Sequence, residues 1–363
     1  MATPPSSSSP LQDATADSGS PSSSAAATPP GGDLLILGAG TLGSIAARLW
    51  MDGGDDGGPP RSVVAETRSE ARHDALRAGG AEPRTREQAD AADAAAAGAS
   101  GGSSETTASP PPPPAVTFSN VLFCMPPSSS DDYAGEARRA VACWRGPSAG
   151  RLVFTSTTGA YAEEEGGVVT EGSPTTPGGG RLGAAEAVIA AAGGTVVRLA
   201  GLYALGRGAH TFWLRRGIVG GNPDGLVNML HYEDAAAAAV AALRCAATGV
   251  RAAAASADAG GSSAAVAADD AAGVDVFLVS DNVPVTRRSL VDSALVHPRF
   301  ADSKPPVFEA DIPSSLPGGV PMPAERGGWG KVIDCSRTWE VLGWKPRFES
   351  YEAFMRGGCT DNV

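Results

Sequence analysis

The segment that most constrains the fold of this chain is DLLILGAGTLGSIAARLW, which spans residues 33–50. An apolar run ends at Leu37, three glycines follow in the spacing G-x-G-x-x-G, and a helical pattern begins directly after the turn. A strand that is continuously apolar, without alternation of apolar and polar residues, suits a parallel sheet that is covered on both faces. The segment therefore predicts the first strand, turn and helix of a doubly wound α/β sheet.

The same alternation of strand and helix continues downstream. Further apolar runs predict strands at SVVAET (62–67), NVLFCMP (120–126), RLVFTST (151–157) and TVVRLAG (195–201). Helical patterns lie between them at 69–80, at about 131–144 and at 183–194, and glycine pairs end the first and the last of these. We therefore expect a Rossmann-like doubly wound parallel sheet.

The chain divides into two folded parts and three segments of biased composition. Residues 1–32, about 89–114 and about 246–273 are rich in Ser, Pro, Ala and Gly, which is typical of disorder. We interpret them as a tail and two surface insertions, since a long loop costs little extra entropy to close. Residues 33–210 are predicted to form the Rossmann domain. Residues 211–358 are predicted to form a smaller C-terminal substrate lobe interleaved with the sheet.

Composition excludes several classes of partner. The formal net charge of −12 argues against nucleic acid and anionic membranes, because both bind clustered Lys and Arg. No apolar run reaches the ~18 residues of a membrane span. The five cysteines lack metal-ligand spacing, so we expect no metal site and a reducing, cytoplasmic location. Import into a plastid is the alternative that the Ser- and Ala-rich N-terminal segment leaves open.

Each glycine of the turn has a distinct expected role. Gly38 permits the tight turn, Gly40 lets a phosphate approach the backbone, and Gly43 lets the helix pack against the strand. The backbone N–H groups of the first helical turn, which includes Thr41 and Leu42, carry partial positive charge that attracts anions. The pattern predicts a site for the pyrophosphate of a dinucleotide.

The end of the second strand carries the residues that select the cofactor. An acidic residue there binds the ribose hydroxyls of NAD, whereas a nearby arginine favours the additional phosphate of NADP. This sequence has both, in Glu66 and Arg68. If Thr67 faces the ribose, Arg68 flanks the phosphate, so NADP is the expected cofactor and NAD the alternative. Cys124 and Pro126 are further candidates for cofactor contact.

Later motifs make the pattern more specific. FTSTTGAY, VVRLAGLYALGRG, VNMLHYEDAA, FLVSDNVPVTRRSL and VLGWKPRF follow GAGTLGS in that order. Together they resemble the extended and atypical short-chain dehydrogenase/reductase family, the NAD(P)-dependent epimerase/dehydratase group. The resemblance covers about residues 33–354, apart from the two insertions. It implies a Rossmann fold and a reaction in which a nicotinamide cofactor exchanges a hydride with a carbonyl or an alcohol.

The resemblance also implies a catalytic Ser or Thr, a Tyr and a Lys, of which the last two are absent. Thr157 matches the hydroxyl position, four residues before Tyr161. Aligned through Glu186, the family's Tyr and Lys positions fall on Gly178 and Leu182. No tyrosine occurs between residues 161 and 203, and all three lysines lie beyond residue 300. A reaction would therefore need a non-standard acid, for which Tyr161 is the first candidate.

Other residues are candidates for contact with a substrate. Ser156 neighbours Thr157 on the strand, His210 lies in the sequence RGAHTFW, and Asn228 matches a position at which family members contact substrate. The resemblance favours an NADP(H)-dependent reductase, or an epimerase/dehydratase-like enzyme, for a small polar or sugar-derived substrate. A homodimer is possible. The alternative is an NADP-binding sensor or scaffold protein without turnover, which accounts for the missing Tyr and Lys.

Overall fold

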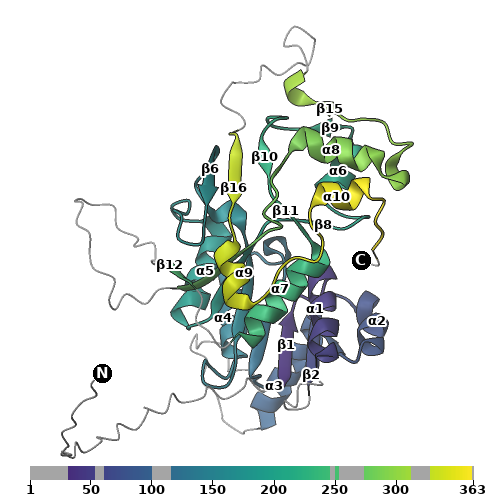
Figure 1. Cartoon of the computed structure of the whole chain (residues 1–363). Coiled ribbons are helices and arrows are strands. Elements are labelled where there is room, and N and C mark those ends of the chain that lie inside the picture. Colours follow the sequence, from purple (N-terminus) through teal and green to yellow (C-terminus); the bar gives the residue numbers. More distant parts are fainter. Residues whose placement is uncertain are drawn as a thin grey trace, which may run out of the picture.

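The computed structural model describes residues 32–53, 61–99, 116–245, 250–252, 274–311 and 328–361. Eight of the described strands form one sheet in the order β12-β13-β7-β5-β4-β1-β2-β3 (Figure 1). They are β1 (Asp33–Leu37), β2 (Ser62–Thr67), β3 (Glu82–Thr85), β4 (Asn120–Phe123), β5 (Leu152–Thr157), β7 (Thr195–Leu199), β13 (Val274–Val279) and β12 (Val250–Ala252). All pairs in it are parallel except β12 with β13.

The strand order confirms the predicted doubly wound sheet. From β1 the chain first moves outward through β2 to β3, and then returns to β4 on the other side of β1. The carboxyl ends of β1 and β4 are therefore the topological switch point, where open α/β sheets bind their ligands. The candidate site lies at this edge.

Helices cover both faces of the sheet, which explains why its strands are continuously apolar. On one face, α1 (Thr41–Asp52) and α7 (Tyr232–Arg244) pack over Leu34 and Ile36. On the other face, α4 (Tyr133–Ala142) and α5 (Gly180–Ala191) pack over Leu35 and Leu37. All four strand residues are at most 1% exposed. Burial of both faces supplies much of the hydrophobic stabilisation of the fold.

The structure adds two elements that the sequence patterns did not predict, and one of them lies largely in a predicted insertion. The polar segment Glu82–Thr85 forms β3, and α3 (Arg86–Ala99) occupies the first part of the predicted insertion at 89–114. The apolar strand β13 joins the main sheet beside β7, and α7 packs against α1, so residues 211–358 contribute to the sheet layers as well as to the smaller lobe. The predicted tail and most of both insertions lie outside the described residues.

The smaller lobe lies over one end of the sheet. Figure 1 shows its helices α6 (Ala209–Arg216), α8 (Arg287–Val296) and α10 (Tyr351–Arg356) gathered away from α2 (His73–Ala78) and α3. Tyr203, Leu290, Tyr351 and Phe354 form its core. Its strands are short: β8 (Gly201–Tyr203), β9 (Ile218–Val219), β10 (Leu226–Val227), β11 (Met229–His231), β14 (Val285–Thr286) and β15 (Val307–Phe308). The parallel pair β8–β11 connects this lobe to the sheet.

A pair of strands and a helix pack near β13. The strands β6 (Glu165–Val169) and β16 (Gly330–Ile333) form a parallel pair, and α9 (Ser336–Leu342) contacts α7 and β13.

Among the described residues, none of the helices combines the length and the hydrophobicity that a membrane span requires.

Candidate functional site

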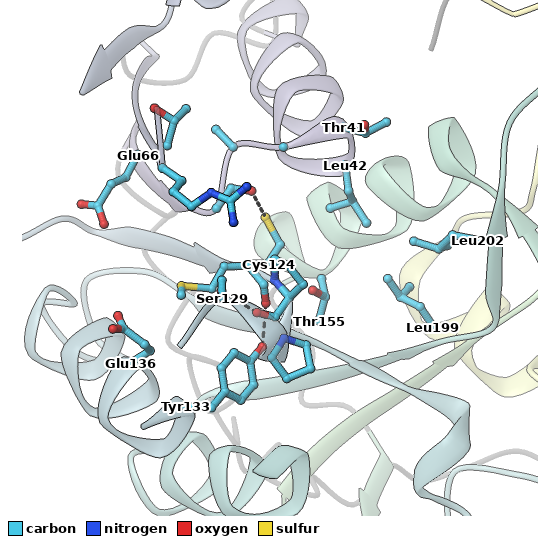
Figure 2. A pocket seen from close by; sticks show the side chains of 18 of the residues that line it. Thr41, Leu42, Glu66, Cys124, Ser129, Tyr133, Glu136, Thr155, Leu199 and Leu202 are labelled. Atoms are coloured by element: carbon cyan, nitrogen blue, oxygen red, sulfur yellow. Dashed lines mark hydrogen bonds between the residues drawn. The ribbon is translucent and has the colours of Figure 1, made fainter. Parts of the chain in front are cut away.

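A cavity of about 1050 Å³ opens at the carboxyl ends of the central strands. It is larger than the ~300–1,000 Å³ of most small-molecule pockets, so it has room for an extended ligand. Its lining includes residues 38–42, 66–69, 71–72, 124–127, 155–157 and 199–202. Figure 2 shows Thr41 and Leu42 on one side of this space, and Cys124 and Thr155 on another.

The three glycines of the turn differ in the space that surrounds them. Gly38 has φ 97°, and a Cβ there would lie 2.5 Å from the backbone of Met125. A Cβ on Gly43 would lie 2.8 Å from the carbonyl oxygen of Gly38, so α1 could not approach β1 as closely. A Cβ on Gly40 would meet nothing nearer than 4.0 Å. Because Gly40 lines the cavity, a larger side chain there would occupy ligand space.

The N-terminus of α1 faces the cavity with its donors free of side-chain caps. Gly40 is the N-cap residue and supplies no side-chain hydrogen bond, and the first turn contains no acidic residue. The N–H groups of Thr41, Leu42 and Gly43 have no partner within the helix. These donors and the helix dipole suit an anionic ligand such as a pyrophosphate.

The loop after β4 forms the opposite wall. The Cys124 thiol donates to the carbonyl oxygen of Gly38 at 3.3 Å, and burial raises its pKa to about 12, so it stays protonated. The Tyr133 hydroxyl donates to the carbonyl oxygen of Met125 at 2.7 Å. Figure 2 shows both hydrogen bonds. Pro126 also lines the cavity, so the loop presents a fixed, largely apolar surface.

At the end of β2 the carboxylate of Glu66 is held by two arginines. Arg139 of α4 donates to both of its oxygens, at 2.7 and 2.6 Å, and Arg84 of β3 donates to one at 3.4 Å. Glu66 is 5% exposed. A carboxylate that accepts this bidentate pair has little capacity left for the hydroxyls of a ribose.

The residues that follow Glu66 present cations to the cavity. Thr67, Arg68 and Arg72 line it, and both arginines are exposed. Arg72 donates to the hydroxyl of Thr41 at 3.4 Å, and thereby extends toward the start of α1. The Thr67 hydroxyl donates to the carbonyl oxygen of Arg84 at 3.3 Å. This end of the cavity suits a second anionic group beside the pyrophosphate.

Two hydroxyls at the end of β5 lie at the other end of the cavity. The hydroxyl of Ser156 donates to Glu186 at 2.5 Å, and Glu186 forms a salt bridge with Arg198 at 2.7 Å. The Thr157 hydroxyl accepts from the N–H of Gly159 at 3.1 Å, which leaves its own proton available to a ligand. Both residues line the cavity.

The positions of the family's Tyr and Lys offer no replacement acid. Gly178 has φ 74°, and a Cβ there would meet no atom within 4 Å. Leu182 lines the cavity with an apolar side chain. The region that would hold a phenol and an ammonium in the resembling family is therefore open space beside a leucine.

Three of the residues predicted for catalysis or substrate contact lie outside the cavity lining. The Tyr161 hydroxyl is buried and donates to the carbonyl oxygen of Glu171 at 3.3 Å. The His210 ring is also buried, and desolvation lowers its pKa to about 4. The Asn228 side chain donates to the carbonyl oxygen of Lys331 at 2.8 Å. These contacts are structural, so we assign none of the three residues a role in binding or catalysis.

The structure brings further residues to the site, three of which lie within the motifs VVRLAGLYALGRG and VNMLHYEDAA. Arg72, Leu202, Arg207 and Tyr232 all line the cavity. Arg207 lies in the turn after β8, and Tyr232 follows β11 directly. Within the sequence they appear as a loop cation and a helix-start aromatic, and the pairing of β8 with β11 brings them together.

Among the described residues, no group of His, Cys, Asp and Glu could hold a metal ion.

Comparison with solved structures identifies the fold. A conserved protein of unknown function from Silicibacter pomeroyi is similar at 21% identity and a TM-score of 0.57, over 90% of this chain and 98% of that one. MoeE5, solved with UDP-glucose and NAD, is similar at 18% identity and a TM-score of 0.56, over 88% of this chain and 95% of that one. UDP-glucose 4-epimerase from Thermotoga maritima is similar at 14% identity and a TM-score of 0.56, over 89% of this chain and 96% of that one.

The chain has the fold of the NAD-dependent epimerase/dehydratase structures. The resemblance expected from the motifs is thus confirmed for the fold. No protein-family model matches the chain, and no curated protein matches it.

Proposed function

We propose that the protein binds NADP(H) along this cavity and acts as a reductase, or as an epimerase/dehydratase-like enzyme, on a small polar or sugar-derived substrate. The observation that carries the proposal is one continuous cavity, which extends from Arg68 past the start of α1 to Thr157. The uncapped N-terminus of α1 would hold the pyrophosphate. The solved neighbours that contain NAD support a nicotinamide cofactor.

The surroundings of Glu66 favour NADP over NAD. Its carboxylate is held by Arg139 and Arg84, whereas Arg68 and Arg72 present guanidinium groups to the same end of the cavity. Arginine binds phosphate through paired N–H donors. We therefore propose that Arg68 and Arg72 hold the 2′-phosphate of NADP.

The chemistry would take place near the end of β5. The bound nicotinamide would supply or accept a hydride. Thr157 would donate its hydroxyl proton to the substrate oxygen and fix its position. The described cavity has no Tyr–Lys pair, so the acid differs from that of the resembling family. Neighbours solved with UDP-glucose support a sugar-derived substrate.

Helices α4 and α5 are the elements that would form a homodimer, as the resemblance implies. They pack side by side, and α5 presents the exposed small residues Ala184 and Ala187. Small side chains permit close helix packing between two copies.

A non-catalytic NADP-binding sensor or scaffold is the second candidate, and Gly178 and Leu182 favour it. Turnover separates the two functions. In a screen of carbonyl compounds, the enzyme oxidises NADPH, and Thr157→Val reduces kcat while Thr157→Ser retains it. The sensor binds NADPH but does not oxidise it with any compound of the screen.

The cofactor proposal is tested by comparing NADPH and NADH binding in the wild type and in Arg68→Gln. We expect the wild type to prefer NADPH and Arg68→Gln to lose about tenfold in NADPH affinity, because charge-assisted hydrogen bonds of ~1.5–3 kcal/mol are lost. NADH affinity should not change. Arg77→Gln is the control, since Arg77 is exposed and pairs with Asp74 outside the cavity. Equal affinities of the wild type for both nucleotides would contradict the proposal.

A further inference from the structure

A pair of side chains, Arg207 and Tyr232, forms the wall of the cavity contributed by the smaller lobe. Both line the cavity, together with Gly201 and Leu202 of β8. The parallel register pairs Leu230 with Leu202 and His231 with Tyr203. The turn after β8 and the start of α7 therefore lie side by side. None of the nucleotide-binding features described above uses this pair.

The pair is fixed by one hydrogen bond that leaves only donors unused. Nε of Arg207 donates to the Tyr232 hydroxyl oxygen at 2.8 Å, and the guanidinium lies 5.6 Å from the centre of the tyrosine ring. Among the described residues, the two terminal nitrogens of Arg207 have no hydrogen-bond partner, and the Tyr232 hydroxyl proton has no acceptor. A guanidinium has no acceptor atom at all. The pair thus offers a set of donors to the cavity.

Carboxylates close to the pair are already engaged elsewhere. Glu233 accepts from the Arg347 side chain at 2.8 Å. Asp234 accepts from the backbone N–H groups of Arg347 and Phe348, at 2.7 and 3.1 Å. Neither carboxylate therefore compensates the charge of Arg207.

Arg86, another arginine of the cavity lining, contrasts with Arg207. Arg86 forms salt bridges with Asp90 and Glu136, at 2.9 and 2.6 Å. The chain has a formal net charge of −12, so carboxylates are abundant. An arginine without a described salt bridge on the wall of a cavity is suited to a charge that a ligand brings.

We propose that Arg207 and Tyr232 form an oxyanion subsite for a phosphate or carboxylate group. The inference rests on the proposed function, because the subsite belongs to the same cavity. The planar fork of Arg207 offers its terminal nitrogens to two oxygens of the anion, and the Tyr232 hydroxyl donates to a third position. The unused donors repel a cation, and an aliphatic group would leave them without hydrogen bonds. The anion is either part of the substrate or the pyrophosphate of the cofactor, and the two sources are separable by binding.

The test compares wild type, Arg207→Gln and Tyr232→Phe. NADPH affinity is measured by cofactor fluorescence, and inorganic phosphate and oxalate are titrated calorimetrically at saturating NADP⁺. For a substrate anion, we expect Arg207→Gln to weaken binding of at least one probe about tenfold or more, and Tyr232→Phe to weaken it less, with NADPH affinity unchanged. For the cofactor pyrophosphate, NADPH affinity itself falls by a similar factor.

Arg215→Gln is the matched control, because Arg215 is exposed on α6 and lies outside the cavity lining. Thermal melting establishes that each variant is folded. The inference is overturned if Arg207→Gln binds NADPH and both probes as the wild type does, or if the wild type binds neither probe and the variant retains NADPH. Failure of the wild type to bind NADPH overturns the proposed function instead. The phosphate and oxalate titrations without cofactor then decide the subsite.

Discussion

Asp281 and His210 are buried titratable residues of the smaller lobe, and burial has opposite consequences for them. Desolvation raises the pKa of Asp281 to about 7. Its Oδ1 accepts from the N–H of Val283, and its Oδ2 has no hydrogen-bond partner among the described residues. Desolvation lowers the pKa of His210 to about 4. His210 is therefore neutral at pH 7, and Asp281 is partly protonated there.

Asp281→Asn should change how stability depends on pH. The folded pKa of Asp281 is raised, so its contribution to stability is lost as pH rises from about 4 to about 7. The variant has no carboxyl group at this position, so its unfolding free energy does not decrease in this way as pH rises. Relative to the wild type, its unfolding free energy should rise between pH 4 and pH 8 by an amount on the order of 2–4 kcal/mol. Urea unfolding at both pH values measures the difference, and a constant difference would rule out the titration.

Glu66 shows why residue-level roles were only partly predictable. The sequence placed Glu66 and Arg68 at the end of β2 but left their roles open. The contacts that hold Glu66 come from Arg84 on β3 and Arg139 on α4. The first belongs to a polar strand without an apolar pattern, and the second is 73 residues away. Local patterns carry no information about such pairs.

At the scale of elements, the turn between β1 and α1 was predictable because each glycine acts locally. Gly38 adopts a positive φ, and Gly43 allows α1 to approach β1. By contrast, β3 lacks the apolar run by which strands are detected, and α3 continues into an Ala-rich stretch that is compositionally biased. Both elements pack against β2, a contact that local sequence patterns do not reveal.

Gly43→Ala should destabilise the protein through this contact. The new Cβ would lie 2.8 Å from the carbonyl oxygen of Gly38, 3.0 Å from a methyl group of Ile36 and 3.1 Å from the Cys124 sulfur. Overpacking of this kind costs about 1–3 kcal/mol, to be measured by chemical unfolding. Gly40→Ala, which meets nothing nearer than 4.0 Å, is the comparison and should lose less. Equal stability of Gly43→Ala and the wild type would refute the packing role.

At the scale of the whole molecule, alternating apolar strands and helices predicted the layered sheet, since each pattern reports burial of its own element. The small-lobe wall of the cavity was not predictable in this way. Arg207 and Tyr232 meet through the pairing of two three-residue strands, β8 and β11, which have no distinctive pattern. The missing Tyr and Lys were evident from the sequence, whereas the open space at Gly178 required the structure.

The central claim is that the exposed amides at the start of α1 anchor the pyrophosphate of a dinucleotide. Gly40→Leu tests it most directly, because its Cβ has space in the fold but projects into the cavity. Gly172→Leu is the control, since a Cβ on Gly172 would also meet no atom within 4 Å and this residue lies outside the cavity lining. Thermal melting should show the melting temperature of the wild type for Gly40→Leu. NADPH titration should show an affinity loss of about 100-fold or more for Gly40→Leu and the affinity of the wild type for the control. Retention of NADPH by folded Gly40→Leu at the affinity of the wild type would contradict the claim.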